Sequence, residues 1–259
     1  MFSKTAMYIY LTVIGVLIIL TAKTLIGCRN YVGENGVNAC SNIIAFSPSD
    51  SLKTFALKKR AQKYQGINKS KEAYADYTAL IQLCGKSGQE LSANDIPVVY
   101  EQTALLAHKL QKLDAAFKYS DMAIRGGVES AEIYKVRAEE NFRRTNYARA
   151  AGDYEKLMDL GLKTISIQFN LGRSYMRLEK YKFAGAQFKN IEMKMKDDFD
   201  FNMVKGFLHY KLRQYDTALR YYKAALRLNP ASAVCKKSIK RTEMKILDRF
   251  KKKKSGLFY

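Results

Sequence analysis

Small and aromatic residues recur along this chain at a fixed period. Four alanines stand 34 residues apart, namely Ala116, Ala150, Ala184 and Ala218. Four residues after each alanine comes a side chain that is aromatic in three of the four cases: Ser120, Tyr154, Phe188 and Tyr222. Short polar segments such as RLEK and KLRQ separate the apolar runs between these positions. A period of this length is typical of repeats built from two helices. The pattern therefore predicts a series of helical hairpins.

The composition agrees with a helical stack. Fifteen glycines and three prolines in 259 residues are few for an all-β fold or for long disordered linkers. We expect Pro48, Pro97 and Pro230 to fall between helices, because proline interrupts a helix interior. A single hairpin cannot bury its apolar face alone, so successive hairpins must pack on one another.

The periodic residues resemble the tetratricopeptide repeat family, whose consensus has a small residue at position 8, alanine at 20, an aromatic residue at 24 and proline at 32. Gly206, Ala218, Tyr222 and Pro230 occupy these positions in the last repeat. The resemblance implies an all-α fold, a right-handed α-solenoid of helix-turn-helix repeats. Small residues at positions 8 and 20 are expected to let the two helices of a repeat approach closely.

Five repeats are expected within residues 54–232. A polar insertion at 88–96 separates the first repeat from the second. The ranges of the repeats are 54–87, 97–130, 131–164, 165–198 and 199–232. Arg137 and Lys205 stand where an apolar residue is expected just before position 8, and Ser120 replaces the aromatic residue. These departures are expected to weaken individual repeats.

The segment after the last repeat predicts a capping helix over 233–250, because the outer face of a terminal repeat has no further repeat to cover it. A basic tail at 251–259 follows. Four consecutive lysines, Lys251, Lys252, Lys253 and Lys254, make it a candidate contact for anionic lipid. A solubilising tail is the alternative interpretation.

Residues 1–22 predict a signal peptide or a membrane anchor. The stretch from Thr5 to Ala22 carries no charge and is mostly apolar. It reaches the lower limit for a membrane-spanning helix, and it equally suits the apolar region of a cleavable signal peptide. Both interpretations stay open, and a buried core helix is a third. Either of the first two predicts a membrane-anchored or exported protein.

Residues 23–53 are interpreted as a degenerate first repeat. Extending the 34-residue register backwards from Ala73 places Gly27 at position 8 and Ala39 at position 20. Cys28 and Cys40 then lie where paired helices approach each other, at a spacing suited to a disulfide. A lipid anchor on Cys28, reduced packing cysteines and a metal site are the alternatives. This segment also loosely resembles the opening of exported or membrane-anchored bacterial tetratricopeptide repeat proteins, which favours the cell envelope or periplasm.

We found no arrangement of residues that indicates catalysis. The two histidines, His108 and His209, lie in different repeats, and no nucleophile or metal-ligand motif stands out. We expect no enzyme activity, no cofactor and no metal. The acidic run at 197–200 is expected to cap a helix, Gly85 to help end one, and Cys84 and Cys235 to be reduced and buried.

The resemblance implies a protein-binding groove lined by the first helices of the repeats. It places Glu132, Ser166 and Asp200 there, together with the candidate partner contacts Lys135, Glu139, Phe142, Arg143, Phe169, Arg173, Met176, Arg177, Met203, Phe207, Tyr210 and Lys211. Exposed aromatic, methionine and arginine side chains suit an extended or helical segment of a partner.

The sequence therefore predicts a non-catalytic scaffold or adaptor for protein–protein interaction. Its arginines favour an acidic partner. The formal charge of +21 raises an alternative, a protein associated with nucleic acid or anionic lipid through its lysine-rich C-terminus. Nucleic acid is the less favoured partner, because the aromatic residues occupy packing positions instead of alternating with the lysines.

Overall fold

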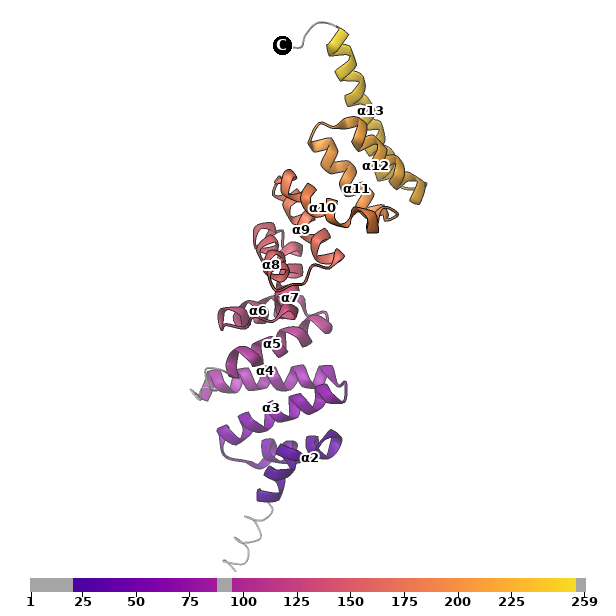
Figure 1. Ribbon diagram of the computed structural model, residues 1–259. Coiled ribbons are helices and arrows are strands. Elements are labelled where there is room, and N and C mark those ends of the chain that lie inside the picture. The colour runs from indigo at the N-terminus through magenta and orange to yellow at the C-terminus, as the bar shows by residue number, and fades with distance from the viewer. Residues whose placement is uncertain (1–20, 88–94, 255–259) are drawn as a thin grey trace, which may run out of the picture. The chain divides into compact units, whose positions relative to one another are not determined.

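The structure is a computed structural model that describes residues 21–87 and 95–254, and all secondary structure within these ranges is α-helical (Figure 1). The predicted all-α class is thus confirmed for the described residues. The chain divides into two compact units, Met1–Val136 and Arg137–Tyr259. Each unit is described by itself.

The first unit is built from antiparallel helix pairs. A helix over residues 21–30 precedes α2. Each later helix packs on the one before it: α3 packs on α2, α4 on α3, α5 on α4 and α6 on α5. The helices that follow residue 30 are α2 (Gly33–Phe46), α3 (Asp50–Gly66), α4 (Ser70–Ser87), α5 (Asp95–Lys109), α6 (Leu113–Arg125) and the first residues of α7 (Ala131–Arg143).

The second unit continues the same pattern. After the end of α7, α9 packs on α8 and α10, α12 on α11, and α13 on α12. Its remaining helices are α8 (Tyr147–Asp159), α9 (Ile165–Arg177), α10 (Tyr181–Met195), α11 (Phe199–Lys211), α12 (Tyr215–Leu228) and α13 (Ala233–Lys254). The expected cap at 233–250 corresponds to α13, which is four residues longer at its C-terminal end.

The periodic residues form the core of both units. The alanines at position 20 have no solvent exposure in any of the five expected repeats: Ala73, Ala116, Ala150, Ala184 and Ala218. The residues at position 24 are also buried: Tyr77, Ser120, Tyr154, Phe188 and Tyr222. Burial of large apolar side chains, at about 1.5–3 kcal/mol for each, is the main favourable contribution to folding.

The small residue at position 8 makes room for the aromatic residue at position 24 of the same repeat. A Cβ atom on Gly172 would lie 2.3 Å from the Phe188 ring, and one on Gly206 would lie 2.6 Å from the Tyr222 ring. These distances are far below van der Waals contact. The small residue at position 8 was expected to let two helices approach closely. The space that it leaves is instead filled by the aromatic ring at position 24.

The turn between the two helices of each repeat uses a residue in the left-handed conformation. At position 15 of all five expected repeats φ lies between 58° and 61°: Asn68, Gln111, Thr145, Glu179 and Arg213. Asparagine tolerates this conformation, whereas a β-branched threonine does so only under strain. None of the five is glycine, so the sequence carries no obvious mark of these turns.

Two of the five repeats contain a buried ion pair between positions 7 and 23. Arg137 donates two hydrogen bonds to Asp153, at 3.0 and 2.7 Å, and Arg60 donates two to Asp76, at 2.8 and 2.7 Å. Both aspartates are almost fully buried. The hydrogen bonds to Asp76 also raise the pKa of the Arg60 guanidinium. Arg137, expected to weaken its repeat, is instead paired in the interior.

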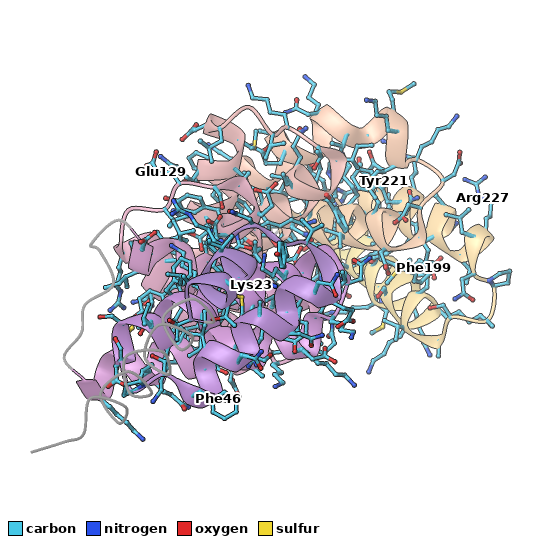
Figure 2. The ribbon with its side chains drawn as sticks, turned by 90° about the horizontal axis from the view of Figure 1, so that it is seen from below. Lys23, Phe46, Glu129, Phe199, Tyr221 and Arg227 are labelled. Carbon is cyan, nitrogen blue, oxygen red and sulfur yellow. A yellow bond between two sulfur atoms is a disulfide. The ribbon has the colours of Figure 1, made fainter. Side chains whose placement is uncertain are left out.

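Lys205, at the same position of the last repeat, has a different partner arrangement. Its ammonium group lies 3.2 Å from the carboxylate of Glu192 and 5.0 Å from the centre of the Tyr221 ring. Burial works to raise the pKa of Glu192, but hydrogen bonds from Tyr221 and Lys205 outweigh it and lower that pKa. The half-buried ring of His209 stacks on Tyr221 at 5.3 Å. Figure 2 labels Tyr221 on the ribbon of this unit.

The first hairpin is closed by a disulfide between Cys28 and Cys40, whose Cα atoms are 4.6 Å apart. Both cysteines are fully buried and pack with Ile43 and Ala56. The Gly27 Cα faces Ala39, where an added Cβ would lie 3.1 Å from the Ala39 Cβ. This is the pair of positions that the backward register identified. Cys84 and Cys235 are free thiols, but Cys84 is only half-buried, so its expected burial was wrong.

Local expectations about helix ends were met in part. Asp198 caps α11, because its carboxylate accepts a hydrogen bond from the Phe201 amide at 2.7 Å. Pro97, expected between helices, lies in the first turn of α5, where its missing N–H group is not needed. Gly85, expected to help end a helix, lies inside α4, which continues to Ser87.

None of the helices within residues 21–87 and 95–254 has the length and apolar character of a membrane span. The apolar segment from Thr5 to Ala22 lies almost entirely outside the described residues, as does most of the insertion at 88–96 and the end of the basic tail. The predicted signal peptide or membrane anchor therefore stays a prediction.

Candidate functional site

In the second unit the first helices of successive repeats lie next to one another. The rings of Phe169 on α9 and Phe201 on α11 are 6.1 Å apart. The guanidinium of Arg173, also on α9, lies 4.8 Å from the ring centre of Phe142 on α7. The residues predicted for the groove lie on these helices.

Arg173 lies against two aromatic rings. Its guanidinium is 4.8 Å from the centre of Phe142 and 5.6 Å from the centre of Phe169. The face of an aromatic ring attracts the guanidinium cation, and this attraction restricts the movement of the arginine side chain. The N–H groups at the edge of a stacked guanidinium stay able to bind a carboxylate in two-point fashion.

Arg241 repeats this arrangement two repeats later. It lies on α13 with its guanidinium 4.9 Å from the ring centre of Tyr210 on α11. The sequence separation is 31 residues in both cases, Arg173 to Phe142 and Arg241 to Tyr210. Counted from Ala233, Arg241 stands at position 9, the position that Arg173 holds in its own repeat. The capping helix thus supplies the next arginine of the same series.

Two further cations lie over aromatic rings on these elements. Arg177 is 5.7 Å from the centre of Tyr147, and Lys211 is 5.5 Å from the centre of Phe207. We call Arg173, Arg177, Lys211 and Arg241, with the rings that they contact, the cation–aromatic row. All of its members belong to the second unit.

The row is electrostatically unbalanced. Among the described residues, none of its four cations forms an ion pair, whereas Arg143 is paired with the buried Glu140 at 3.4 Å. Three acidic side chains are predicted for the same face, Glu132, Glu139 and Asp200. Glu132 belongs to the first unit, and Asp200 lies in the first turn of α11. The row therefore offers restrained guanidinium and ammonium groups that no carboxylate of the described part of the chain neutralises.

The buried Tyr154 lies close to Arg173 of the row. Burial is the main cause that raises the pKa of Tyr154, and the charge of Glu139 raises it further. Arg173 and a hydrogen bond with Asn170 act in the opposite direction. Tyr154 is therefore a buried, neutral neighbour of Arg173.

The structure separates the predicted contacts into exposed and structural ones. Phe207 is 41% exposed, and Arg143, Arg177 and Lys211 are also exposed. Met176 is only 7% exposed, so its expected exposure was wrong, whereas its contact with a partner stays a prediction. Phe169 and Met203 are half-buried, Phe169 between Phe188 and Phe201, so both contribute mainly to packing. The side chains of Glu132 and Lys135 are exposed on the part of α7 that belongs to the first unit.

Sequence reasoning missed two members of the row. Arg241 lies within the predicted capping helix, and Tyr147 is not among the residues predicted for the groove. Continuing the 34-residue register past residue 232 would have identified Arg241, because it falls at the position of Arg173. In the basic tail, Lys251 is exposed, whereas the side chains of Lys252, Lys253 and Lys254 lie outside the described residues.

A comparison with protein families gives a direct assignment for the last hairpin. The profile of the family described as tetratricopeptide repeat matches residues 200–232, which comprise nearly all of α11 and α12. Residues 200–232 are a tetratricopeptide repeat. The resemblance expected from the periodic residues is thereby confirmed, and the range 199–232 expected for the last repeat differs from the match by one residue.

Solved tetratricopeptide repeat structures share this fold. One is entitled "Crystal structure of YrrB: a TPR protein with an unusual peptide-binding site"; it is 14% identical, with a TM-score of 0.60 over 79% of this chain and 99% of that one. Another, a MamA D159K mutant, is 12% identical, with a TM-score of 0.55 over 70% of this chain and all of that one. At these identities the likeness shows the fold alone. A comparison with curated proteins found no match.

Proposed function

We propose that this chain is a non-catalytic scaffold whose cation–aromatic row binds an acidic segment of a partner protein. The observation that carries the proposal is the set of four cations that lie over aromatic rings and have no carboxylate partner within residues 21–87 and 95–254. A carboxylate on the partner would form ion pairs with these cations. The exposed ring of Phe207 adds an apolar contact beside them.

The fold supports this role at the level of analogy. Tetratricopeptide repeats expose the faces of successive helices as an extended surface, which suits an extended or helical peptide. One protein of this fold, YrrB, is described as having a peptide-binding site. The shared fold therefore favours a protein partner by analogy, and the cations of the row favour an acidic one.

We further propose that the scaffold is membrane-anchored or exported, with the bacterial cell envelope favoured. Two observations support this proposal. The first is the uncharged segment from Thr5 to Ala22, and the second is the buried Cys28–Cys40 disulfide. Structural disulfides form and persist mainly in oxidising compartments.

The experiment that tests the binding proposal is affinity capture with charge-reversed variants of the full chain. The test variant carries Arg173→Glu and Arg241→Glu. The control carries Arg149→Glu and Lys189→Glu, two exposed residues on the second helices α8 and α10. Both variants change the net charge by the same amount.

We expect the control to retain the partners of the wild-type chain and the test variant to lose them. Truncation or reversal of a central arginine commonly costs more than about 2 kcal/mol of binding free energy. If the two variants lost binding equally, the attraction would come from net charge alone. If neither lost it, the row would not be the binding site.

A further inference from the structure

The C-terminal end of the second unit carries many basic residues besides Arg241 of the cation–aromatic row. α13 contains ten lysines and arginines against Glu243 and Asp248, so its 22 residues carry a formal charge of +8. α12 has 14 residues, and the last turns of α13 continue beyond it (Figure 1). This end of the helix is therefore accessible from several sides.

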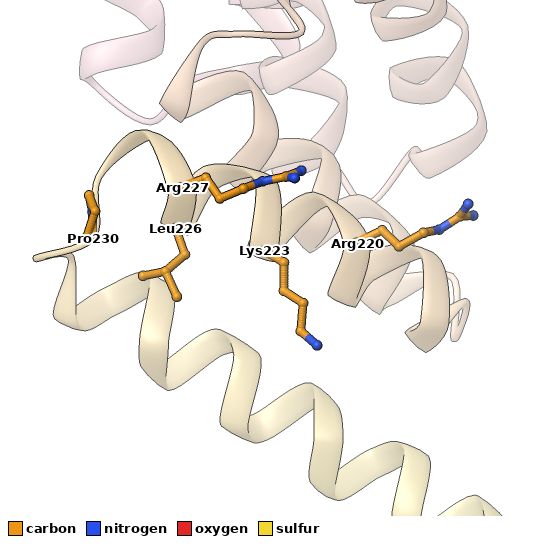
Figure 3. Close-up of a pocket in the computed structure, with 5 residues that line it drawn as sticks. All are labelled: Arg220, Lys223, Leu226, Arg227 and Pro230. Carbon is orange, nitrogen blue, oxygen red and sulfur yellow. The ribbon is translucent and has the colours of Figure 1, made fainter.

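A hollow of about 920 Å³ lies along α12 on this side of the unit. Arg220, Lys223 and Arg227 line it together with Leu226 and Pro230. Lys223 and Leu226 point from α12 toward α13 (Figure 3), and the Arg227 side chain points away from the ribbon (Figure 2). Three cations at a spacing of three and four residues share one face of a helix.

The one acidic residue of α12 is already paired. Asp216, one turn before Arg220, forms an ion pair with Arg249 of α13 at 2.7 Å. Among the described residues, Arg220, Lys223 and Arg227 form no ion pair, although Arg220 donates a hydrogen bond to Thr217. The hollow is thus a site of uncompensated positive charge.

Large apolar side chains are also exposed on α13. Met244 and Leu247 are each 58% exposed and Phe250 is 55% exposed. Their spacing of three residues places them along one side of α13. Exposed apolar side chains combined with clustered lysines and arginines are typical of helices that lie in a membrane interface.

We propose that this C-terminal surface, comprising Arg220, Lys223, Arg227, Met244, Leu247 and Phe250, docks on a bilayer that contains anionic phospholipids. The cations contact the phosphate groups, and the three apolar side chains enter the boundary between headgroups and acyl chains. Nucleic acid has the same charge but would leave Met244 and Leu247 in water. It would also find only one aromatic ring, Phe250, for stacking among these residues.

The absence of tryptophan from the chain allows a direct test. Phe250→Trp in the full chain provides a single fluorescent reporter at the proposed contact. Phe183→Trp, on α10 of the same unit, is the matched control because Phe183 is similarly exposed, at 61%. Each protein is combined with vesicles of phosphatidylcholine alone or mixed with phosphatidylglycerol. A brominated lipid serves as the quencher of tryptophan at the interface.

We expect quenching of Trp at position 250 with the anionic vesicles, and little with the neutral vesicles or at position 183. Addition of Arg220→Glu, Lys223→Glu and Arg227→Glu should lower the apparent binding constant at least about tenfold, since each basic residue near an anionic surface contributes about fivefold or more. The matched control reverses Lys71, Lys182 and Lys189, which are exposed elsewhere. It should bind as the parent does.

Three results would overturn the proposal. The first is equal quenching at positions 250 and 183, which would show insertion by another part of the chain. The second is quenching that survives reversal of the three cations of the hollow. The third is a response of the position-250 reporter to a DNA duplex but not to anionic vesicles, which would identify nucleic acid as the partner. Circular dichroism of every variant verifies that it is folded.

Discussion

At the scale of single residues, the repeat depends on a few positions with strict steric demands. Position 8 must be small because the ring at position 24 occupies the space above it, as for Gly206 and Tyr222. Position 15 must adopt a positive φ, as Thr145 does at 61°. The first demand is visible in the sequence as a recurring glycine or alanine. The second is not, because five different polar side chains meet it.

Gly206→Ala should destabilise the second unit, because the new methyl group would overlap the Tyr222 ring. Overpacking of a filled interior typically costs about 1–3 kcal/mol in the free energy of unfolding. Gly152→Ala is the control, because a Cβ atom at this helical glycine meets nothing within 4 Å. It should instead stabilise the chain by about 0.5–1 kcal/mol. Urea denaturation followed by circular dichroism measures both, and a similar loss in the two variants would contradict the steric account.

Thr145→Gly should stabilise the chain by about 1 kcal/mol, because glycine adopts the left-handed conformation without the steric cost that a Cβ atom brings. Asn68→Gly, at the equivalent position of the first repeat, should change stability much less, since asparagine already tolerates a positive φ. Thermal unfolding distinguishes the two. A destabilised Thr145→Gly variant would mean that the threonine side chain contributes more than its strain costs.

At the scale of helices, charged residues have structural roles that the hydrophobic pattern does not reveal. Arg137 and Asp153 stand 16 residues apart, as do Arg60 and Asp76, and each pair connects the two helices of one repeat. An arginine that interrupts an apolar position looks unfavourable in the sequence alone. The structure supplies its carboxylate from position 23 of the same repeat. A search for an acidic residue at this fixed offset would have predicted both pairs.

Asp153→Asn should be strongly destabilising, because it leaves the mostly buried Arg137 without its carboxylate. Loss of one partner of a buried pair typically costs about 3–5 kcal/mol. Asp216→Asn breaks the exposed pair with Arg249, which has the same 2.7 Å N···O distance. It should cost less than about 1 kcal/mol because solvent screens an exposed pair. Equal effects on the urea midpoint would contradict the assignment of different roles.

At the scale of the whole molecule, the architecture was predictable and the binding chemistry only in part. The 34-residue register gave the helical hairpins, the buried alanines and the position of the first cysteine pair. It also placed Phe142, Arg173 and Tyr210 on the first helices. It did not reveal that Met176 is buried, because that depends on how one helix packs on the next, and it identifies Arg241 only when it is continued past residue 232.

The disulfide connects the structure to the environment of the protein. Protein isolated without reductant and then denatured should expose two reactive thiols, Cys84 and Cys235, and four after reduction. This follows because a disulfide buried in the first hairpin is protected from exchange until the chain unfolds. Alkylation followed by mass spectrometry counts the thiols. Four reactive thiols before reduction would show that Cys28 and Cys40 are not joined and would weaken the argument for an exported protein.

The central claim is that the cation–aromatic row holds an acidic segment of a partner protein. The most direct measurement is cross-linking in cells with p-benzoylphenylalanine in place of Phe207, whose exposed ring lies beneath Lys211. The same substitution at Phe183 is the control. We predict a cross-link from position 207 to a peptide rich in Asp or Glu, none from position 183, and loss of the product when Arg173 and Arg241 are reversed. Equal cross-linking from both positions, or a product that persists after the reversal, would contradict the account.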